Sequence, residues 1–108
     1  LKSDHAMNLP APVEDALYWV AEEALNNALK HAAAPSVEVQ LHRDGPRVEL
    51  AVVDNGKGFV PAELPDSGRM GLESMRGRME HQGGVLRIVS QPGEGTSVLA
   101  SLEIGALP

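Results

Sequence analysis

Apolar side chains recur at helical spacing between residues 12 and 33. At about 100° per residue they form one continuous face, which is typical of an amphipathic helix. Its members are Val13, Leu17, Val20, Ala24 and Ala28. Pro12 suits the first turn of a helix, and Pro35 stops one. The pattern therefore predicts a helix over residues 12–33.

Two pairs of strands are predicted by alternating or β-rich segments. Residues 36–43 place apolar side chains at every second position, and a turn at residues 44–46 leads into the apolar strand 47–53. Further strands are expected at 85–90 and 96–104, joined by a Pro- and Gly-containing turn. Both pairs are typical of antiparallel hairpins.

The segment between the hairpins divides into a loop and a second helix. Residues 55–70 show no period and are rich in Gly, Pro, Asp and Ser. A loop this long in a small domain is usually functional or disordered. Leu72, Met75 and Met79 then follow at helical spacing and predict a helix over residues 70–82. The order helix, hairpin, loop, helix, hairpin indicates helices packed on one face of a sheet.

Composition narrows the class of protein. The chain has 108 residues, of which 43% are hydrophobic, enough for one small domain with its own core. Its formal net charge of −6 argues against a nucleic-acid surface. The absence of cysteine excludes disulfides and thiolate metal sites. No apolar run approaches the ~20 residues of a membrane span, so we expect no direct membrane contact by this domain.

A polar row lies along the edge of the first helix's apolar face. Glu23, Asn27, Lys30 and His31 make up this row. Helical spacing lines them up, either as a solvated border or as the wall of a pocket between helix and sheet. A carboxylate, an amide and a cation on one line can offer a base, a neutral oxygen for Mg²⁺ and a counter-charge for phosphate.

A carboxylate at the end of the second strand enters a loop with few side chains. Asp54 follows the apolar run 48–53 and precedes Gly56 and Gly58. Glycine lets backbone approach a planar ligand closely, because it has no Cβ. The same stretch is also ordinary turn chemistry, so by itself it leaves both interpretations open.

Four motifs in a fixed order resemble the ATP-binding domain of sensor histidine kinases. Residues 23–31 resemble the N box E-x-x-x-N-x-x-[KR]-H, and residues 54–59 resemble the first glycine box D-x-G-x-G-[FIL]. Residues 68–78 resemble the second glycine box, G-x-G-L-x-x-M-R-x-R, and residues 93–96 resemble the last, G-x-G-T. The wider group includes DNA gyrase, the heat-shock chaperone ATPases and the mismatch-repair ATPases. The Met-Arg-x-Arg ending resembles the subclass of the nitrate sensor and the membrane-fluidity sensor.

This resemblance implies the Bergerat ATPase fold, a two-layer α/β sandwich with helices on one face of a mixed, mostly antiparallel sheet. It implies that Asp54 accepts a hydrogen bond from the exocyclic amine of adenine, and that Thr96 completes this contact directly or through water. A 6-carbonyl in place of the amine would face the carboxylate, which is strongly discriminating. Gly56 and Gly58 would let the backbone pass the base.

The resemblance also implies roles for the polar row. Asn27 would ligate Mg²⁺, Lys30 would lie near the phosphates, and Glu23 would polarise a water or the metal shell. His31 is carried into the nucleotide site by the motif, although a helix C-terminus favours a histidine cation without any ligand.

The second glycine box departs from the family pattern. Gly68 and Gly71 are separated by two residues where G-x-G is commoner, so only Gly71 is carried over with ease. Gly71 and Leu72 are expected to open the second helix, where free N–H groups and the helix dipole favour phosphate. Residues 55–70 would form the lid over ATP. Phe59 is the only Phe, so the separate Phe-containing lid motif of larger kinases is missing.

The implied function is the Mg-ATP-binding catalytic domain of a sensor histidine kinase. It would supply the γ-phosphoryl group to a histidine in a dimerisation domain upstream, from which a response regulator would take it. We expect residues 1–11 to be a linker and residues 12–108 to be the catalytic domain, located in the cytoplasm. The full-length protein is expected to be a homodimer, and its membrane anchoring is left open. This fragment should bind ATP but hardly autophosphorylate.

Two alternatives remain open. An anti-sigma-factor-type serine kinase shares the N box and the first glycine box, although Lys30-His31 and Met-Arg-x-Arg favour the histidine kinase. A non-catalytic nucleotide-binding module belongs to a different class. Intact Glu23, Asn27 and Asp54 argue against it.

Overall fold

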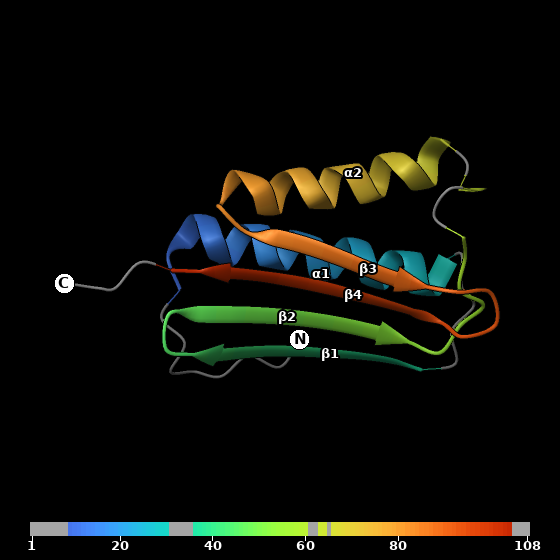
Figure 1. Cartoon of the computed structure of the whole chain (residues 1–108), viewed down its shortest axis with the longest axis horizontal. Coiled ribbons are helices and arrows are strands. Elements are labelled where there is room, and N and C mark those ends of the chain that lie inside the picture. The colour runs from blue at the N-terminus through green and yellow to red at the C-terminus, as the bar shows by residue number, and fades with distance from the viewer. Residues whose placement is uncertain (1–8, 31–35, 61–62, 65, 105–108) are drawn as a thin grey trace.

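The computed structural model describes residues 9–30, 36–60, 63–64 and 66–104. Its elements in chain order are α1 (Ala11–Lys30), β1 (Val37–Asp44), β2 (Arg47–Asp54), α2 (Asp66–His81), β3 (Val85–Ser90) and β4 (Thr96–Glu103). The two helices lie side by side on one face of a four-stranded sheet (Figure 1). The two-layer sandwich expected from the sequence is confirmed.

The sheet has the strand order β1-β2-β4-β3. Each hairpin pairs its own two strands, and β2 joins the hairpins by pairing with β4. All three pairings are antiparallel, so the parallel component of the expected mixed sheet is not found among the described strands. The β2–β4 pairing is decisive for function, because it sets the end of one hairpin against the start of the last strand.

The core fills the space between the helices and one face of the sheet. All five apolar residues predicted for the first helix are buried, and all of them except Ala28 belong to the core cluster that includes Val48 and Leu50 of β2. From α2, Met75 and Met79 are completely buried, and Leu72 packs at the margin of the core. Full burial of a side chain of this size contributes about 1.5–3 kcal/mol.

The start of the second helix was predicted wrongly. α2 begins at Asp66, not at residue 70, so the loop between β2 and α2 spans only residues 55–65. The Asp-Ser-Gly sequence was interpreted as loop, but Asp and Ser are residue types that favour a helix start, and an acidic residue suits its positive end. Residues 66–70 of the segment expected to form the lid are therefore helical.

Other boundaries agree within a residue or two where the structure describes them. α1 begins at Ala11, and its predicted continuation over residues 31–33 lies outside the described residues. Most of the expected linker, residues 1–8, also lies outside them, while Leu9 packs against the core. Of the helices described, none is long and apolar enough to cross a membrane.

Candidate functional site

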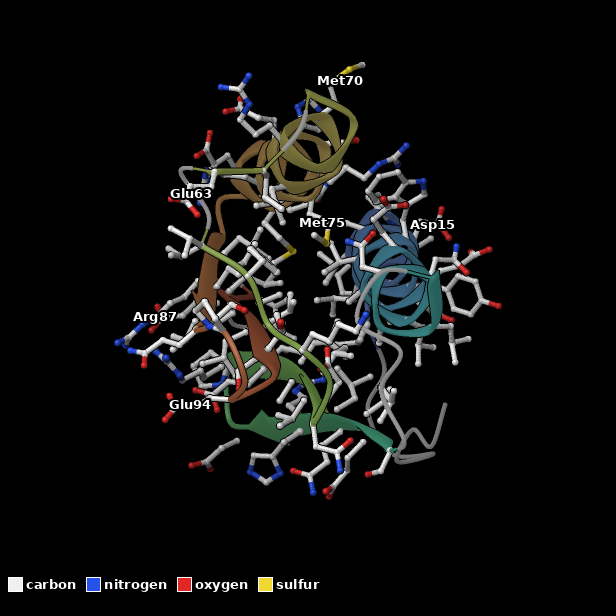
Figure 2. All side chains as sticks on the ribbon, turned by 90° about the vertical axis from the view of Figure 1, so that its right-hand side faces the viewer. Asp15, Glu63, Met70, Met75, Arg87 and Glu94 are labelled. Atoms are coloured by element: carbon white, nitrogen blue, oxygen red, sulfur yellow. The ribbon has the colours of Figure 1, made fainter. Side chains whose placement is uncertain are left out.

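The predicted site residues that the structure describes lie toward one end of the molecule, the right-hand end in Figure 1. There β2 and β3 end, β4 begins, α1 reaches Lys30, and α2 starts. The arrangement follows from the topology, because antiparallel strands and the oppositely directed helices bring segments distant in sequence to the same end. Figure 2 looks onto this end and shows the β3–β4 turn, marked by Glu94, below α2.

Asp54 and Thr96 form a cross-strand pair at this end of the sheet. They are register partners between β2 and β4. Directly opposed residues in an antiparallel pair project from the same face of the sheet, and here that face is the one that the helices cover. Both residues are 8% exposed, and they are the only buried polar residues in the described part of the chain. A carboxylate and a hydroxyl thus lie together at the edge of an apolar core.

The Asp54 carboxylate stabilises the turn after β2 and can still accept a hydrogen bond from a ligand. Its Oδ1 accepts the Gly56 N–H at 2.9 Å, which is the local turn chemistry expected of Asp before Gly. An ionised carboxylate has about four acceptor positions, so this bond leaves room for an outside donor. The turn and ligand interpretations of this residue are therefore compatible.

The first glycine box is held against the β3–β4 turn by two close backbone approaches. Gly58 has φ of 66°, and a Cβ there would overlap the carbonyl oxygen of Gln91. Gly95 has φ of 77°, and a Cβ there would overlap the carbonyl oxygen of Asp54. The Gly93 N–H also donates to the Lys57 carbonyl. Gly58 is thus required by a backbone crossing, a reason that the sequence did not reveal.

Ser90 also belongs to the site, although it lies in none of the four motifs. Its Oγ accepts the Phe59 N–H at 2.9 Å, donates to the Gly95 carbonyl at 3.1 Å, and lies 2.9 Å from Thr96 Oγ1. The available signal was register: in the predicted second hairpin Ser90 stands directly opposite Thr96. One hydroxyl therefore joins the first glycine box, the last glycine box and the buried Thr.

Within the polar row on α1, Glu23 lies against the second turn of α2. Glu23 and Asn27 lie one turn apart and are both half-buried. Glu23 Oε1 lies 2.9 Å from the position that a Cβ on Gly71 would take, so the second glycine box lets the two helices approach here. Lys30 is the last residue of α1. Its side chain and the whole of His31 lie outside the described part of the structure.

Gly71 and Leu72 do not open the second helix, contrary to our expectation. They occupy its second turn, because α2 starts at Asp66. Their N–H groups therefore lie within the hydrogen-bonded part of the helix, and the unpaired N–H groups belong to its first four residues. Gly71 instead lies against Glu23, and Leu72 packs at the margin of the core.

The side-chain oxygens at this end of the molecule could bind a metal ion only together with oxygens from a bound ligand. Among the described residues, no group of three or more His, Cys, Asp or Glu side chains could hold a metal ion. Mg²⁺ commonly takes one or two protein oxygens and completes its shell with phosphates and waters. The half-buried Asn27 amide, with the Glu23 carboxylate one turn away, fits that kind of site.

Arg78 belongs to a different contact. Its guanidinium carbon lies 4.1 Å from the centre of the Trp19 ring, a cation–π contact between α2 and α1. Arg78 comes from the last turn of α2, away from the helix start at the site. In this structure it serves helix packing.

Comparison with known proteins identifies a family and two similar curated proteins. Residues 13–106 match the family described as histidine kinase-, DNA gyrase B-, and HSP90-like ATPase. The sensor histidine kinase LiaS of Bacillus subtilis (strain 168) is 38% identical over 92 residues, which are 85% of this chain and 25% of LiaS. The signal transduction histidine-protein kinase/phosphatase DegS of Brevibacillus brevis is 37% identical over 95 residues, 88% of this chain and 24% of DegS.

A solved structure shares the fold. The ATP binding domain of PrrB from Mycobacterium tuberculosis superposes with a TM-score of 0.66 and 26% identity, over 91% of this chain and 71% of that one. The chain spans about a quarter of the length of the curated relatives it matches. The chain belongs to the histidine kinase-, DNA gyrase B- and HSP90-like ATPase family and is homologous to sensor histidine kinases.

Proposed function

We propose that this chain is the Mg-ATP-binding catalytic domain of a sensor histidine kinase. The observation that carries this proposal is the buried Asp54–Thr96 pair, which lies at the end of the sheet where α1 ends and α2 begins. Both residues occupy the family's motif positions, and the curated relatives of this chain are sensor histidine kinases.

Asp54 is the adenine reader in this proposal. Its carboxylate accepts a hydrogen bond from the exocyclic amine of adenine, while Oδ1 stays bonded to the Gly56 N–H. Thr96 supports the same edge of the base, and the backbone at Gly56 and Gly58 passes it. A 6-oxo purine would place a carbonyl oxygen against the carboxylate and leave buried acceptors unpaired, which is costly.

The phosphates lie toward the helices. Asn27 would hold Mg²⁺ through its amide oxygen, and the bound ion supplies charge neutralisation on the phosphates. Glu23 orients a water or the metal shell from one turn away. Lys30 provides counter-charge near the phosphates, and His31 follows it in the motif. Gly71 and Leu72 border the phosphates from the second turn of α2.

The whole protein then transfers the γ-phosphoryl group of ATP to a histidine on dimerisation helices upstream, and a response regulator takes it from there. We propose that the full-length protein is a homodimer and that this domain is cytoplasmic. Its subclass is that of the nitrate and membrane-fluidity sensors. Because the acceptor histidine lies outside this chain, the fragment binds ATP without appreciable autophosphorylation.

Labelling of the full-length protein with γ-phosphate-labelled ATP tests the activity. We expect incorporated label that acid removes, the behaviour of phosphohistidine. The variant Asn27→Ala should lose the label, while Asn26→Ala, its exposed neighbour on α1, should keep it. Acid-stable label would indicate the anti-sigma-factor-type serine kinase instead. ATP binding with no label would indicate a non-catalytic module.

A further inference from the structure

The hydroxyl of Ser90 sits at the centre of a small network beside the proposed adenine site. It contacts three groups: the Phe59 N–H, the Gly95 carbonyl oxygen and the Thr96 hydroxyl. The three distances lie between 2.9 and 3.1 Å, and the longest, from Ser90 Oγ to the Gly95 carbonyl oxygen, is at the upper end for an O–H···O bond. The network is partly buried, so its bonds are not freely exchanged with water.

Counting protons fixes the direction of each bond. A serine hydroxyl has one proton to donate and two lone pairs to accept. The Phe59 N–H can only donate, so it takes one lone pair of Ser90. The Gly95 carbonyl oxygen can only accept, so it accepts the one hydrogen bond that the Ser90 hydroxyl can donate. The remaining contact is satisfied only if the Thr96 hydroxyl donates to the second lone pair of Ser90.

The opposite direction is costly. If Ser90 donated to Thr96, the Ser90 and Gly95 oxygens would face each other at 3.1 Å with no proton between them. Leaving a polar group without a partner in a partly buried site is destabilising. In this network the Thr96 hydroxyl therefore donates its hydrogen bond to Ser90.

We propose that Ser90 is a positioning residue that sets the polarity of the adenine site. Because the Thr96 hydroxyl donates its hydrogen bond to Ser90, it can only accept a hydrogen bond from a ligand. Its neighbour Asp54 is likewise an acceptor. Two acceptors side by side can receive the two protons of a 6-amino group, whereas the carbonyl oxygen at position 6 of a 6-oxo purine offers a proton to neither of them. This inference rests on the proposed function, because it assumes that a purine base binds at Asp54.

Without Ser90 the Thr96 hydroxyl can rotate and donate. It could then pair with the carbonyl of a 6-oxo purine, so discrimination weakens even if the fold is unchanged. A purely structural role for Ser90, through its bond to Phe59, would weaken binding of both bases alike. The ratio of the two affinities separates these roles.

Calorimetry with Mg-ADP and with Mg-IDP, its 6-oxo counterpart, measures this ratio. We expect wild type to prefer ADP and Ser90→Ala to reduce that preference by about tenfold, the fold-change that corresponds to one hydrogen bond. Ser90→Thr, which keeps the hydroxyl, should restore the ratio. Ser101→Ala, on the opposite face of the same sheet, should leave it unchanged.

Each outcome has a definite meaning. An equal loss of affinity for both nucleotides in Ser90→Ala, or an unchanged ratio, overturns this inference and leaves the proposed function standing. Wild type that binds neither nucleotide overturns both. If Ser90→Ala does not fold, Ser90→Cys carries the same test, because a thiol is a weak donor and acceptor of similar size, and it should give an intermediate ratio.

Discussion

The Glu23 carboxylate occupies the space beside Gly71: its Oε1 lies 2.9 Å from where a Cβ on Gly71 would stand. This contact joins the N box on α1 to the second glycine box on α2. It gives Gly71 a reason to be glycine that does not depend on a special backbone conformation.

Gly71→Ala should therefore trade stability against function. Alanine favours a helix interior over glycine by about 0.5–1 kcal/mol, but its methyl group must push the flexible Glu23 side chain aside. We expect little net change in unfolding free energy and a weaker Mg²⁺ dependence of nucleotide binding, measured by calorimetry with and without the ion. Gly77→Ala on the same helix has open space and should gain the stability without altering binding. Identical behaviour of the two variants would contradict this account.

Gly95 and Gly93 provide a matched pair in the β3–β4 turn. Both have positive φ, at 77° and 82°, so both alanine variants incur the same kind of backbone cost. Only at Gly95 would the new Cβ meet the Asp54 carbonyl, while Gly93 has open space. We expect Gly95→Ala to lose about 1–3 kcal/mol more than Gly93→Ala in urea unfolding. Equal losses would show that the crossing at Asp54 is not tight.

Met75 and Met70 lie on different sides of α2. Met75 points into the space between helices and sheet and is fully buried, whereas Met70 points outward and is 70% exposed (Figure 2). Met75→Ala should lower the unfolding free energy by about 2–5 kcal/mol, because it leaves a cavity. Met70→Ala should stay within about 0.5 kcal/mol. Chemical denaturation of both variants checks this, and a small effect at Met75 would argue against the packing described.

The layers of the fold could be predicted from the sequence because they depend on local periodicity. The alternating strand 36–43 and the apolar face of α1 are repeated signals, and each arises within one element alone. The start of α2 could not be predicted, because Asp66, Ser67 and Gly68 are residue types as common in loops as at the start of a helix. Their helical state depends on the apolar face of the later turns, which packs against the core.

The site was only partly predictable for a related reason. Asp54 and Thr96 stand in recognisable motifs, whereas Ser90 does not. Its importance arises from the register opposite Thr96 and from the crossing of the first glycine box over the turn. Both depend on pairings between distant segments, which no local pattern encodes.

The central claim is that the Asp54 carboxylate reads the amine of adenine. The variant Asp54→Asn tests it with little disturbance, because the amide oxygen of Asn can still accept the Gly56 N–H while its NH₂ group faces the ligand. Asp44→Asn, exposed at the opposite end of the sheet, is the control.

Calorimetric titration of Mg-ADP into wild type and both variants is the most direct measurement. We predict that wild type and Asp44→Asn bind with equal affinity. Asp54→Asn should bind about 10–100-fold more weakly, the scale of a lost hydrogen bond to a charged group. Undiminished binding by a folded Asp54→Asn would contradict the account.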